Sequence, residues 1–235
     1  MEFYKLEANG NNFIVTINNN DLSKDIVRMC SEKYGIGADG YLNIDSNFNV
    51  SIFNKDGSTA NMCGNGLRCL VKLLNTLTNE KSFTFFVNGK SIYSYIENSL
   101  CAIAIDSPIL LKQSNGYYIN LMNNHFIMFK KDVQNYIFTD KDIDFSKSNN
   151  CNIHVIEIIN KSKIKIKTYE YGVGVTTSCG SGSICAFFVC NMLGKVGNSA
   201  EILTDGGSLF VEMSNNKYIL KGVSNLIFKG EYYGI

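Results

Sequence analysis

The sequence predicts a mixed α/β protein, mostly strands, that is built from two similar halves. Three observations support this prediction. Short strand-like runs are separated by turns rich in Asn, Gly and Ser, only a few segments show helical periodicity, and one cysteine-glycine motif occurs twice. With 235 residues, the chain is long enough for two small domains that each bury an apolar core.

The strands are predicted from runs of β-branched and aromatic residues that end at polar turns. In the first half these runs are Phe13–Ile17, Tyr41–Ile44, Val50–Phe53, Phe83–Val87, Ser91–Ile96 and Cys101–Ile105. In the second half they are Tyr117–Leu121, Phe126–Phe129, His154–Ile158, Ile164–Tyr169, Ser208–Met213 and Lys217–Leu220.

An early helix is predicted to start at Asp21, whose side chain suits an N-cap. The apolar residues of this helix recur at helical spacing, at Leu22, Ile26, Cys30 and Tyr34.

The motif C-G-x-G-x-x-C occurs at Cys63–Cys69 and again at Cys179–Cys185, half a chain apart. Each copy leads into an apolar segment of helical period: Leu67, Leu70, Val71 and Leu74 after the first, and Ile184, Phe187, Phe188 and Met192 after the second. A weaker echo pairs Asn11–Ile14 with Asn123–Ile127. We therefore predict a duplicated domain, with halves at residues 1–115 and 116–223, in which Cys63 and Cys179 each stand at the start of a helix.

One such motif would be weak support for a functional site, because glycine-rich turns before helices are common for structural reasons. Structure alone would accept Ser or Ala in the first position, yet both copies carry a thiol. A cysteine at a helix N-terminus lies at the positive end of the helix dipole, so we expect its pKa to fall toward neutrality. The glycines that follow allow backbone N–H groups to close on an anion such as a carboxylate.

Two thiols of this kind suit racemisation at the α-carbon of an amino acid. The α-proton is weakly acidic, so the carbanion needs delocalisation into a carboxylate that is held by preorganised donors. A thiolate removes the proton on one face and a thiol returns a proton on the other. We expect no cofactor, since the sequence contains no P-loop and no lysine in a context that predicts a Schiff base.

The other cysteines are expected to be reduced, because eight cysteines without a secretory signal do not predict a disulfide framework. Cys30, Cys101, Cys151 and Cys190 are assigned to the core, and Cys69 and Cys185 to helix packing. No metal site is expected. There is no Cys-x-x-Cys pair, and His125 and His154 lie far in sequence from any cluster of cysteines.

Charge and hydropathy exclude several partners. The formal net charge is +1, and no run of Lys and Arg predicts a nucleic-acid or membrane surface. No apolar stretch approaches the roughly 20 residues that span a bilayer, and the first residues lack the apolar core of a signal peptide. We therefore expect a cytoplasmic protein with a small amino-acid substrate. The oligomeric state is left open, a homodimer included.

Nearly the whole chain resembles the diaminopimelate epimerases, which are cofactor-free enzymes with two catalytic cysteines. The residues that carry the resemblance are Gly10–Phe13, Gly35–Gly40, Phe53–Ser58, Met62–Cys69, Tyr169–Gly174, Ser178–Gly182, Gly206–Leu209 and Phe228–Glu231. Within the first of these, Asn12 replaces an acid of the family pattern.

The resemblance implies a fold of two similar domains, each a curved sheet wrapped around a central helix, with the active site in the cleft between them. It implies that the last strand, about 224–235, completes the first domain. It makes Cys63 and Cys179 the base and the acid. The implied substrate-binding groups are the N–H groups of Gly64, Asn65, Gly180 and Ser181 for the α-carboxylate, Asn11 and Glu170 near the amino group, and Asn54, Asn123 and Asn152 at the far end of the substrate.

Tyr171 is the departure from the family pattern with the largest chemical consequence. Relatives that act on diaminopimelate have arginine after the glutamate, and a guanidinium can hold a distal carboxylate bidentately. Charge-assisted hydrogen bonds contribute about 1.5–3 kcal/mol each, so a tyrosine predicts weaker binding of a dicarboxylic substrate. We therefore predict a different amino acid, with histidine as one hypothesis, because histidine racemases exist among the two-cysteine relatives.

Three alternatives stay open at this stage. The chain could be a diaminopimelate epimerase of lysine or peptidoglycan biosynthesis despite Tyr171. It could be an isomerase that uses a single carboxylic acid, although that chemistry does not need two cysteines. It could also be a non-catalytic relative that binds an anion or senses oxidation through its thiols.

Overall fold

The computed structural model describes residues 1–19 and 25–234. The chain divides into two units, residues 1–103 with 222–235, and residues 104–221. The predicted boundary after residue 115 differs from this division, because β8 (Ile109–Gln113) pairs with β9 (Tyr117–Leu121) of the second unit. Among the described residues no helix combines the length and apolar character needed to cross a bilayer.

The first unit contains a five-stranded sheet in the order β17-β1-β2-β3-β4. Its strands are β1 (Glu2–Ala8), β2 (Asn11–Ile17), β3 (Gly40–Ile44), β4 (Val50–Asn54) and β17 (Asn225–Glu231). Only β2 and β3 run parallel; the other neighbours are antiparallel. Three further antiparallel strands follow, β5 (Ser82–Val87), β6 (Lys90–Glu97) and β7 (Leu100–Ile105).

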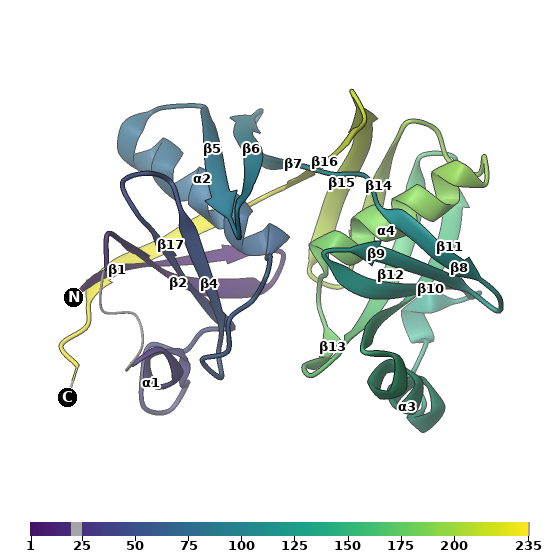
Figure 1. The fold of residues 1–235 in the computed structure, drawn as a ribbon, viewed down its shortest axis with the longest axis horizontal. Coiled ribbons are helices and arrows are strands. Elements are labelled where there is room, and N and C mark those ends of the chain that lie inside the picture. The colour runs from purple at the N-terminus through teal and green to yellow at the C-terminus, as the bar shows by residue number, and fades with distance from the viewer. Residues whose placement is uncertain (20–24, 235) are drawn as a thin grey trace. The chain divides into compact units, whose positions relative to one another are not determined.

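Helix α2 (Gly64–Thr78) is the central helix of the first unit and contacts β1, β2, β6 and β17 (Figure 1). Its predicted apolar residues, Leu67, Leu70, Val71 and Leu74, are all buried. The helix ends at Asn79, which adopts a left-handed conformation (φ 62°) and donates its N–H to the Asn75 carbonyl. Asparagine tolerates this conformation better than most residues, which makes it a suitable helix end.

The second unit repeats this design. Its sheet has the order β16-β15-β14-β12-β11-β10-β9-β8, and β13 (Gly174–Thr176) pairs with β12. The remaining strands are β10 (Asn123–Phe129), β11 (Cys151–Asn160), β12 (Lys163–Glu170), β14 (Ser199–Thr204), β15 (Gly207–Ser214) and β16 (Lys217–Gly222). Helix α4 (Gly180–Met192) packs on β9, β10, β11, β12, β14 and β15 (Figure 1). It is buried on nearly every side, as expected for a helix that strands surround.

The strand pairings show that the two units are copies. The order β17-β1-β2-β3-β4 corresponds to β8-β9-β10-β11-β12, and the single parallel pair of the first set, β2 with β3, corresponds to β10 with β11. Asn11 in β2 is equivalent to Asn123 in β10, as the sequence echo indicates. The strand registers of the two sets then give three equivalent pairs: Phe13 and His125, Leu42 and His154, and Ile52 and Thr168. Two residues further along β4 and β12, Asn54 is equivalent to Glu170.

The predicted early helix is shorter than expected. Helix α1 covers only Ile26–Cys30, and the predicted cap Asp21 and Leu22 lie outside the described residues. Tyr34 lies in a turn and is exposed, so its assignment to the helix was wrong. The chain turns back on the helix end here, because the N–H groups of Ile36 and Gly37 both donate to the Met29 carbonyl.

Several elements were not predicted, although one of them has a clear signal. Helix α3 (Asp140–Asn149) starts with a capping box, in which the Thr139 hydroxyl accepts from the Asp142 N–H and the Asp142 carboxylate accepts from the Thr139 N–H. The strands β1, β8, β13 and β14 and the 3-10 helix η1 (Val133–Asn135) were also missed.

The fourth residue of each cysteine motif is a glycine on which a strand side chain packs. A Cβ at Gly182 would lie 2.1 Å from His154 Cε1, and a Cβ at Gly66 would lie 2.9 Å from Leu42 Cδ2. The imidazole in the second copy is rigid, whereas the leucine methyl in the first copy can move aside. The packing is therefore less tolerant of a side chain at Gly182 than at Gly66.

We expect Gly182→Ala to lower the free energy of unfolding by about 1–3 kcal/mol through overpacking. Gly66→Ala should lower it less. Both substitutions raise helix propensity by the same amount, so the difference between the two variants reports packing alone. Gly197→Ala is the control, because nothing lies within 4 Å of a Cβ there. Urea unfolding of the three variants measures the difference, and equal losses at Gly66 and Gly182 would contradict this packing.

Candidate active site

Cys63 occupies the N-cap of α2, as the motif predicted. Its backbone is extended (φ −143°, ψ 105°), and its sulfur accepts a hydrogen bond from the Gly66 N–H at 3.3 Å. The side chain is partly exposed. A sulfur at this position lies next to the first free N–H groups of the helix, which are the groups that stabilise a negative charge.

Arg68 lies one turn further along the same helix and is fully buried. Its Nη1 donates to Asn9 Oδ1 at 2.9 Å and to the Val223 carbonyl at 3.4 Å, and its Nη2 donates to Asn65 Oδ1 at 2.6 Å. Nε has no hydrogen-bond partner among the described residues. These three acceptors of the guanidinium are all neutral amide oxygens.

Burial lowers the pKa of Arg68, and nearby groups that can carry negative charge oppose this shift: the thiols of Cys69, Cys101 and Cys63, then Glu7. An arginine remains protonated in proteins even when its pKa falls. The first unit therefore holds a buried positive charge within electrostatic reach of Cys63. Arg68 stands inside the first motif, but the motif alone does not predict its burial or its charge beside the helix start.

Cys179 is the N-cap of α4 and is buried in its unit. Its sulfur lies 3.6 Å from the Ser181 hydroxyl oxygen. Burial raises the pKa of the Cys179 thiol well above its usual range and the Glu170 carboxylate raises it further, whereas the Ser181 hydroxyl and the Gly182 N–H act in the opposite direction. The expectation that the helix start would bring this pKa toward neutrality is therefore wrong for Cys179, because burial and a neighbouring acid outweigh the helix.

Glu170 ends β12 and brings its carboxylate to Cys179. The carboxylate accepts a hydrogen bond from Thr176 Oγ1 at 2.7 Å. Burial raises the pKa of Glu170, and hydrogen bonds from Thr176 and Cys179 lower it in part. The Cys179 thiol is the donor and the Glu170 carboxylate is the acceptor in this pair. The interaction favours the protonated form of Cys179.

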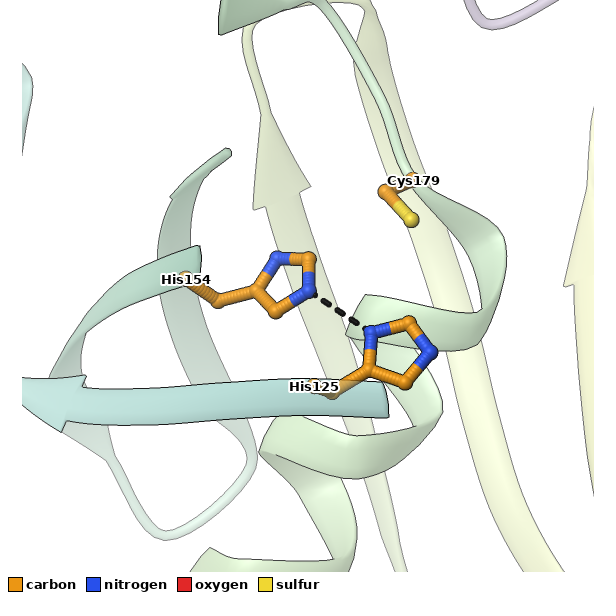
Figure 2. A group of neighbouring side chains, drawn as sticks. All are labelled: His125, His154 and Cys179. Atoms are coloured by element: carbon orange, nitrogen blue, oxygen red, sulfur yellow. Dashed lines mark hydrogen bonds between the residues drawn. The ribbon is translucent and has the colours of Figure 1, made fainter. Parts of the chain in front are cut away.

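Two buried histidines lie beside Cys179 (Figure 2). His125 comes from β10 and His154 from β11, and one ring nitrogen or thiol sulfur from each of His125, His154 and Cys179 lies within 4.8 Å of the others. The histidines are far from the cysteine motifs in sequence but not in space, because β10 and β11 pair in parallel and both strands contact α4.

The histidines form a hydrogen-bonded chain. His125 Nδ1 lies 2.9 Å from His154 Nε2, and His154 Nδ1 lies 2.9 Å from Thr168 Oγ1. Burial lowers the pKa of His125 to about 4, with an opposing effect of the Leu121 carbonyl, and burial followed by His125 lowers the pKa of His154 well below its usual value. Both rings are therefore neutral near pH 7.

A cysteine and two histidines form a ligand set that zinc accepts. In this arrangement, however, the facing nitrogens of His125 and His154 hydrogen-bond to each other, so they do not both direct a lone pair at one ion (Figure 2). The group is better described as a neutral polar chain beside the thiol.

The other predicted site residues lie at strand ends or helix starts. Asn11 begins β2, Asn123 begins β10, and Asn54 ends β4, where its Nδ2 donates to Ser58 Oγ at 2.9 Å. Gly64, Asn65, Gly180 and Ser181 form the first turns of α2 and α4.

Asn152 and Tyr171 are brought together. Asn152 is buried in β11, and its Oδ1 accepts from the Tyr171 N–H at 2.9 Å. The Tyr171 side chain is 47% exposed and lies just beyond Glu170 at the end of β12. Its ring is therefore available to a ligand and is not part of a core.

The thiols that were assigned to packing are where the sequence placed them. Cys30, Cys69, Cys101, Cys151, Cys185 and Cys190 are buried and free. Burial raises the pKa of Cys69 and Cys185 well above the usual range, so these thiols stay protonated. Cys63 and Cys179 differ from these six in their place at the two helix starts.

Comparison with known proteins agrees with the motifs. The family model for diaminopimelate epimerase matches residues 3–99 and 119–226. A diaminopimelate epimerase from Prochlorococcus marinus (strain NATL2A) is 33% identical over 277 aligned positions, which cover 97% of this chain and 98% of that protein.

Two solved structures show the same fold at low sequence identity. A protein described as a predicted epimerase from Pseudomonas aeruginosa has a TM-score of 0.80 and 9% identity, covering 100% of this chain and 99% of that one. A hydroxyproline epimerase from Agrobacterium vitis, solved with bound trans-4-hydroxy-L-proline, has a TM-score of 0.65 and 10% identity, covering 98% and 90%.

The family model matches both copies of the cysteine motif, and the relative spans almost the full length of the chain. This chain belongs to the diaminopimelate epimerase family and is an isomerase of the racemase and epimerase class.

Proposed function

We propose that this protein inverts the α-carbon of an amino acid with Cys63 and Cys179 as the base and acid, without a cofactor. The observation that supports this most is the equivalence of the two helix starts. In both units a cysteine is the N-cap of a long helix, and a glycine at the next position leaves the first N–H groups open to an anion. Family membership supports the reaction class, and the motifs support the choice of residues.

The proposed reaction moves one proton off the α-carbon and another onto it. A thiolate takes the α-proton, and the electron pair of the broken C–H bond spreads into the α-carboxylate. The N–H groups of Gly64, Asn65, Gly180 and Ser181 are proposed to hold that carboxylate, where fixed dipoles favour the growing charge. The other cysteine then donates its thiol proton to the opposite face, which gives the inverted amino acid and leaves that cysteine as thiolate.

The substrate is proposed to be an amino acid other than diaminopimelate. The residue that follows Glu170 is Tyr171, whose side chain is half exposed. Its backbone N–H donates to Asn152 Oδ1. A phenol donates one neutral hydrogen bond and stacks on rings, whereas a guanidinium holds a carboxylate with two charge-assisted bonds. Histidine is our leading candidate, because an imidazole can both stack on Tyr171 and hydrogen-bond to amide side chains.

Diaminopimelate epimerisation is the second candidate, and the name of the Prochlorococcus marinus relative favours it. The hydroxyproline epimerase with a similar fold shows that this fold also serves a substrate without a second amino-acid group. Incubation in deuterated water with a panel of amino acids, followed by mass spectrometry of the α-position, would separate the two candidates.

Cys63→Ala or Cys179→Ala should each abolish racemisation, because one face of the α-carbon then has no acid or base. Exchange of the α-proton from a single enantiomer is the activity that can remain. Cys69→Ala and Cys185→Ala are matched controls from the same motifs, and they should lower stability more than turnover, since both thiols are buried in helix packing. Racemisation by Cys63→Ala at the wild-type rate would refute the mechanism.

If both cysteines act on one carbon, mild oxidation of the ligand-free enzyme should join Cys63 to Cys179. A disulfide requires Cα atoms about 4.4–6.8 Å apart, so the bond forms only if the two sulfurs can approach one point. Activity should disappear on oxidation and return with a reductant, and peptide mapping should find this pair. Mapping that pairs each of them with other cysteines would contradict a shared site.

Tyr171→Arg should lower kcat/KM for the natural substrate and raise it for diaminopimelate, by an order of magnitude or more in the ratio of the two. A guanidinium replaces the ring on which the natural substrate is proposed to stack, and it gains two charge-assisted bonds when a second carboxylate is present. Tyr171→Phe is the control, because it keeps the ring and removes the hydroxyl. Wild-type enzyme that prefers diaminopimelate over every other amino acid would exclude this substrate assignment.

A further inference from the structure

Three buried side chains with metal-binding atoms meet inside the second unit. His125, His154 and Cys179 are 0%, 0% and 6% exposed, and all three belong to residues 104–221. One nitrogen of each ring and the Cys179 sulfur lie within 4.8 Å of one another (Figure 2). Thiolate sulfur and imidazole nitrogen are the ligands that zinc and related transition metals select, whereas magnesium and calcium prefer oxygen. The donor set of the cluster therefore fits a cation of the zinc class.

His154 packs closely against the helix start that carries Cys179. A Cβ at Gly182 would lie 2.1 Å from His154 Cε1 and 2.6 Å from each of its ring nitrogens, so the edge of the ring touches the first turn of α4. His154 Nδ1 also lies 2.9 Å from Thr168 Oγ1. Histidine ligands usually have such a partner on their second nitrogen, because it fixes the ring and its tautomer. His154 is thus already held in place for a ligand role.

The two histidines need little movement to admit an ion. Their facing nitrogens, His125 Nδ1 and His154 Nε2, share one hydrogen at a separation of 2.9 Å, and the ion has to take the place of that hydrogen. Two nitrogens on one tetrahedral zinc ion lie about 3.3 Å apart, because each Zn–N bond is about 2.0–2.1 Å. The rings therefore separate by about 0.4 Å. The shared hydrogen moves to the outer nitrogen of the ring that carries it, so both rings stay neutral, and His154 Nδ1 then donates to Thr168.

The fold itself does not require these polar groups. The first unit has Phe13 and Leu42 where the second has His125 and His154. Burying two imidazoles in place of apolar side chains costs desolvation, and His125 Nε2 is buried without a hydrogen-bond partner among the described residues. Packing alone therefore does not account for the pair, and a ligand role does.

We propose that Cys179, His125 and His154 bind one Zn²⁺ ion or a cation of the same class, through the thiolate sulfur and the two facing nitrogens. Binding releases the thiol proton to solvent. Water fills the fourth position, as in other zinc sites with three protein ligands. Cys179 cannot serve the metal and the reaction together, so the bound ion inhibits the enzyme reversibly. This inhibition, unlike the site itself, rests on the function proposed above.

The test uses the Cys63→Ala enzyme, in which the two helix-start thiols cannot hold an ion between them. Zinc affinity is measured by competition with a chromophoric chelator. Co²⁺ is the spectroscopic probe, because a thiolate ligand gives it a charge-transfer band in the near ultraviolet. We expect one ion per chain and this band. Adding Cys179→Ala should remove the band, whereas adding Cys185→Ala, which deletes a buried thiol further along α4, should leave the band and the affinity unchanged.

The first unit supplies the ligand variants. His125→Phe and His154→Leu introduce the residues that stand at the equivalent positions there, so we expect both variants to fold. In the Cys63→Ala background each should weaken zinc binding about tenfold or more, and Thr168→Val should weaken it about tenfold by removing the outer partner of His154. A merely structural role would lower the free energy of urea unfolding and leave zinc affinity unchanged. Should one histidine variant fail to fold, the other and Thr168→Val decide the matter.

Folded Cys63→Ala that binds neither metal at micromolar free concentration would overturn the proposal. A charge-transfer band that survives the loss of Cys179, or an affinity that neither histidine variant changes, would also overturn it. In wild type, zinc should stop racemisation and a chelator should restore it, and full activity with the site loaded would exclude the inhibition. Metal binding needs no turnover, so a protein that binds cobalt through these residues and racemises nothing would refute the proposed function and leave the site standing.

Discussion

The contact between each cysteine motif and one strand side chain determines the geometry of both helix starts. Gly66 lies against Leu42, and Gly182 lies against His154, with no space for a Cβ without displacement. Each contact holds the first turn of a long helix close to the sheet of its own unit. The cysteine precedes that turn, so its sulfur is fixed relative to the strand ends that carry Asn54 or Glu170. The position of the thiol is therefore a consequence of core packing, and it does not depend on a flexible loop.

Much of this arrangement could be read from the sequence, because it follows from local patterns. The repeat C-G-x-G-x-x-C placed both helix starts, and alternation of apolar residues placed most strands. The buried cysteines were also assigned correctly, since a free thiol in a chain of this composition is most often a core residue. The helix α3 was missed despite the capping box at Thr139, because its residues are mostly polar and give no apolar period.

What could not be read from the sequence depends on contacts between distant segments. The pKa of Cys179 follows from Glu170 and from burial, neither of which the local motif contains. The His125–His154 pair arises from the parallel pairing of two strands that are separated by α3. Arg68 is visible in the motif, but its hydrogen bonds are not. Its guanidinium donates to Asn9 and Val223, which lie near opposite ends of the chain.

The comparison of the two copies separates what the fold needs from what the reaction needs. Phe13, Leu42 and Ile52 fill the first unit where His125, His154 and Thr168 stand in the second. Apolar residues satisfy packing at these positions, so the polar chain in the second copy is not required by the fold. It places neutral groups with both donor and acceptor capacity beside the Cys179 thiol, whose pKa is raised by burial and by Glu170.

The pairing of β17 with β1 has a consequence for how the protein is made. The first unit receives its last strand from residues 225–231, whereas the second unit is one continuous segment, residues 104–221. During translation the second segment leaves the ribosome complete, while the sheet that begins at the N-terminus still lacks an edge strand. The unit that starts first is therefore finished last, and its completion needs contacts across nearly the whole chain, a feature that slows folding. Until β17 has been synthesised, β1 presents an open edge, which is the kind of surface that chaperones protect.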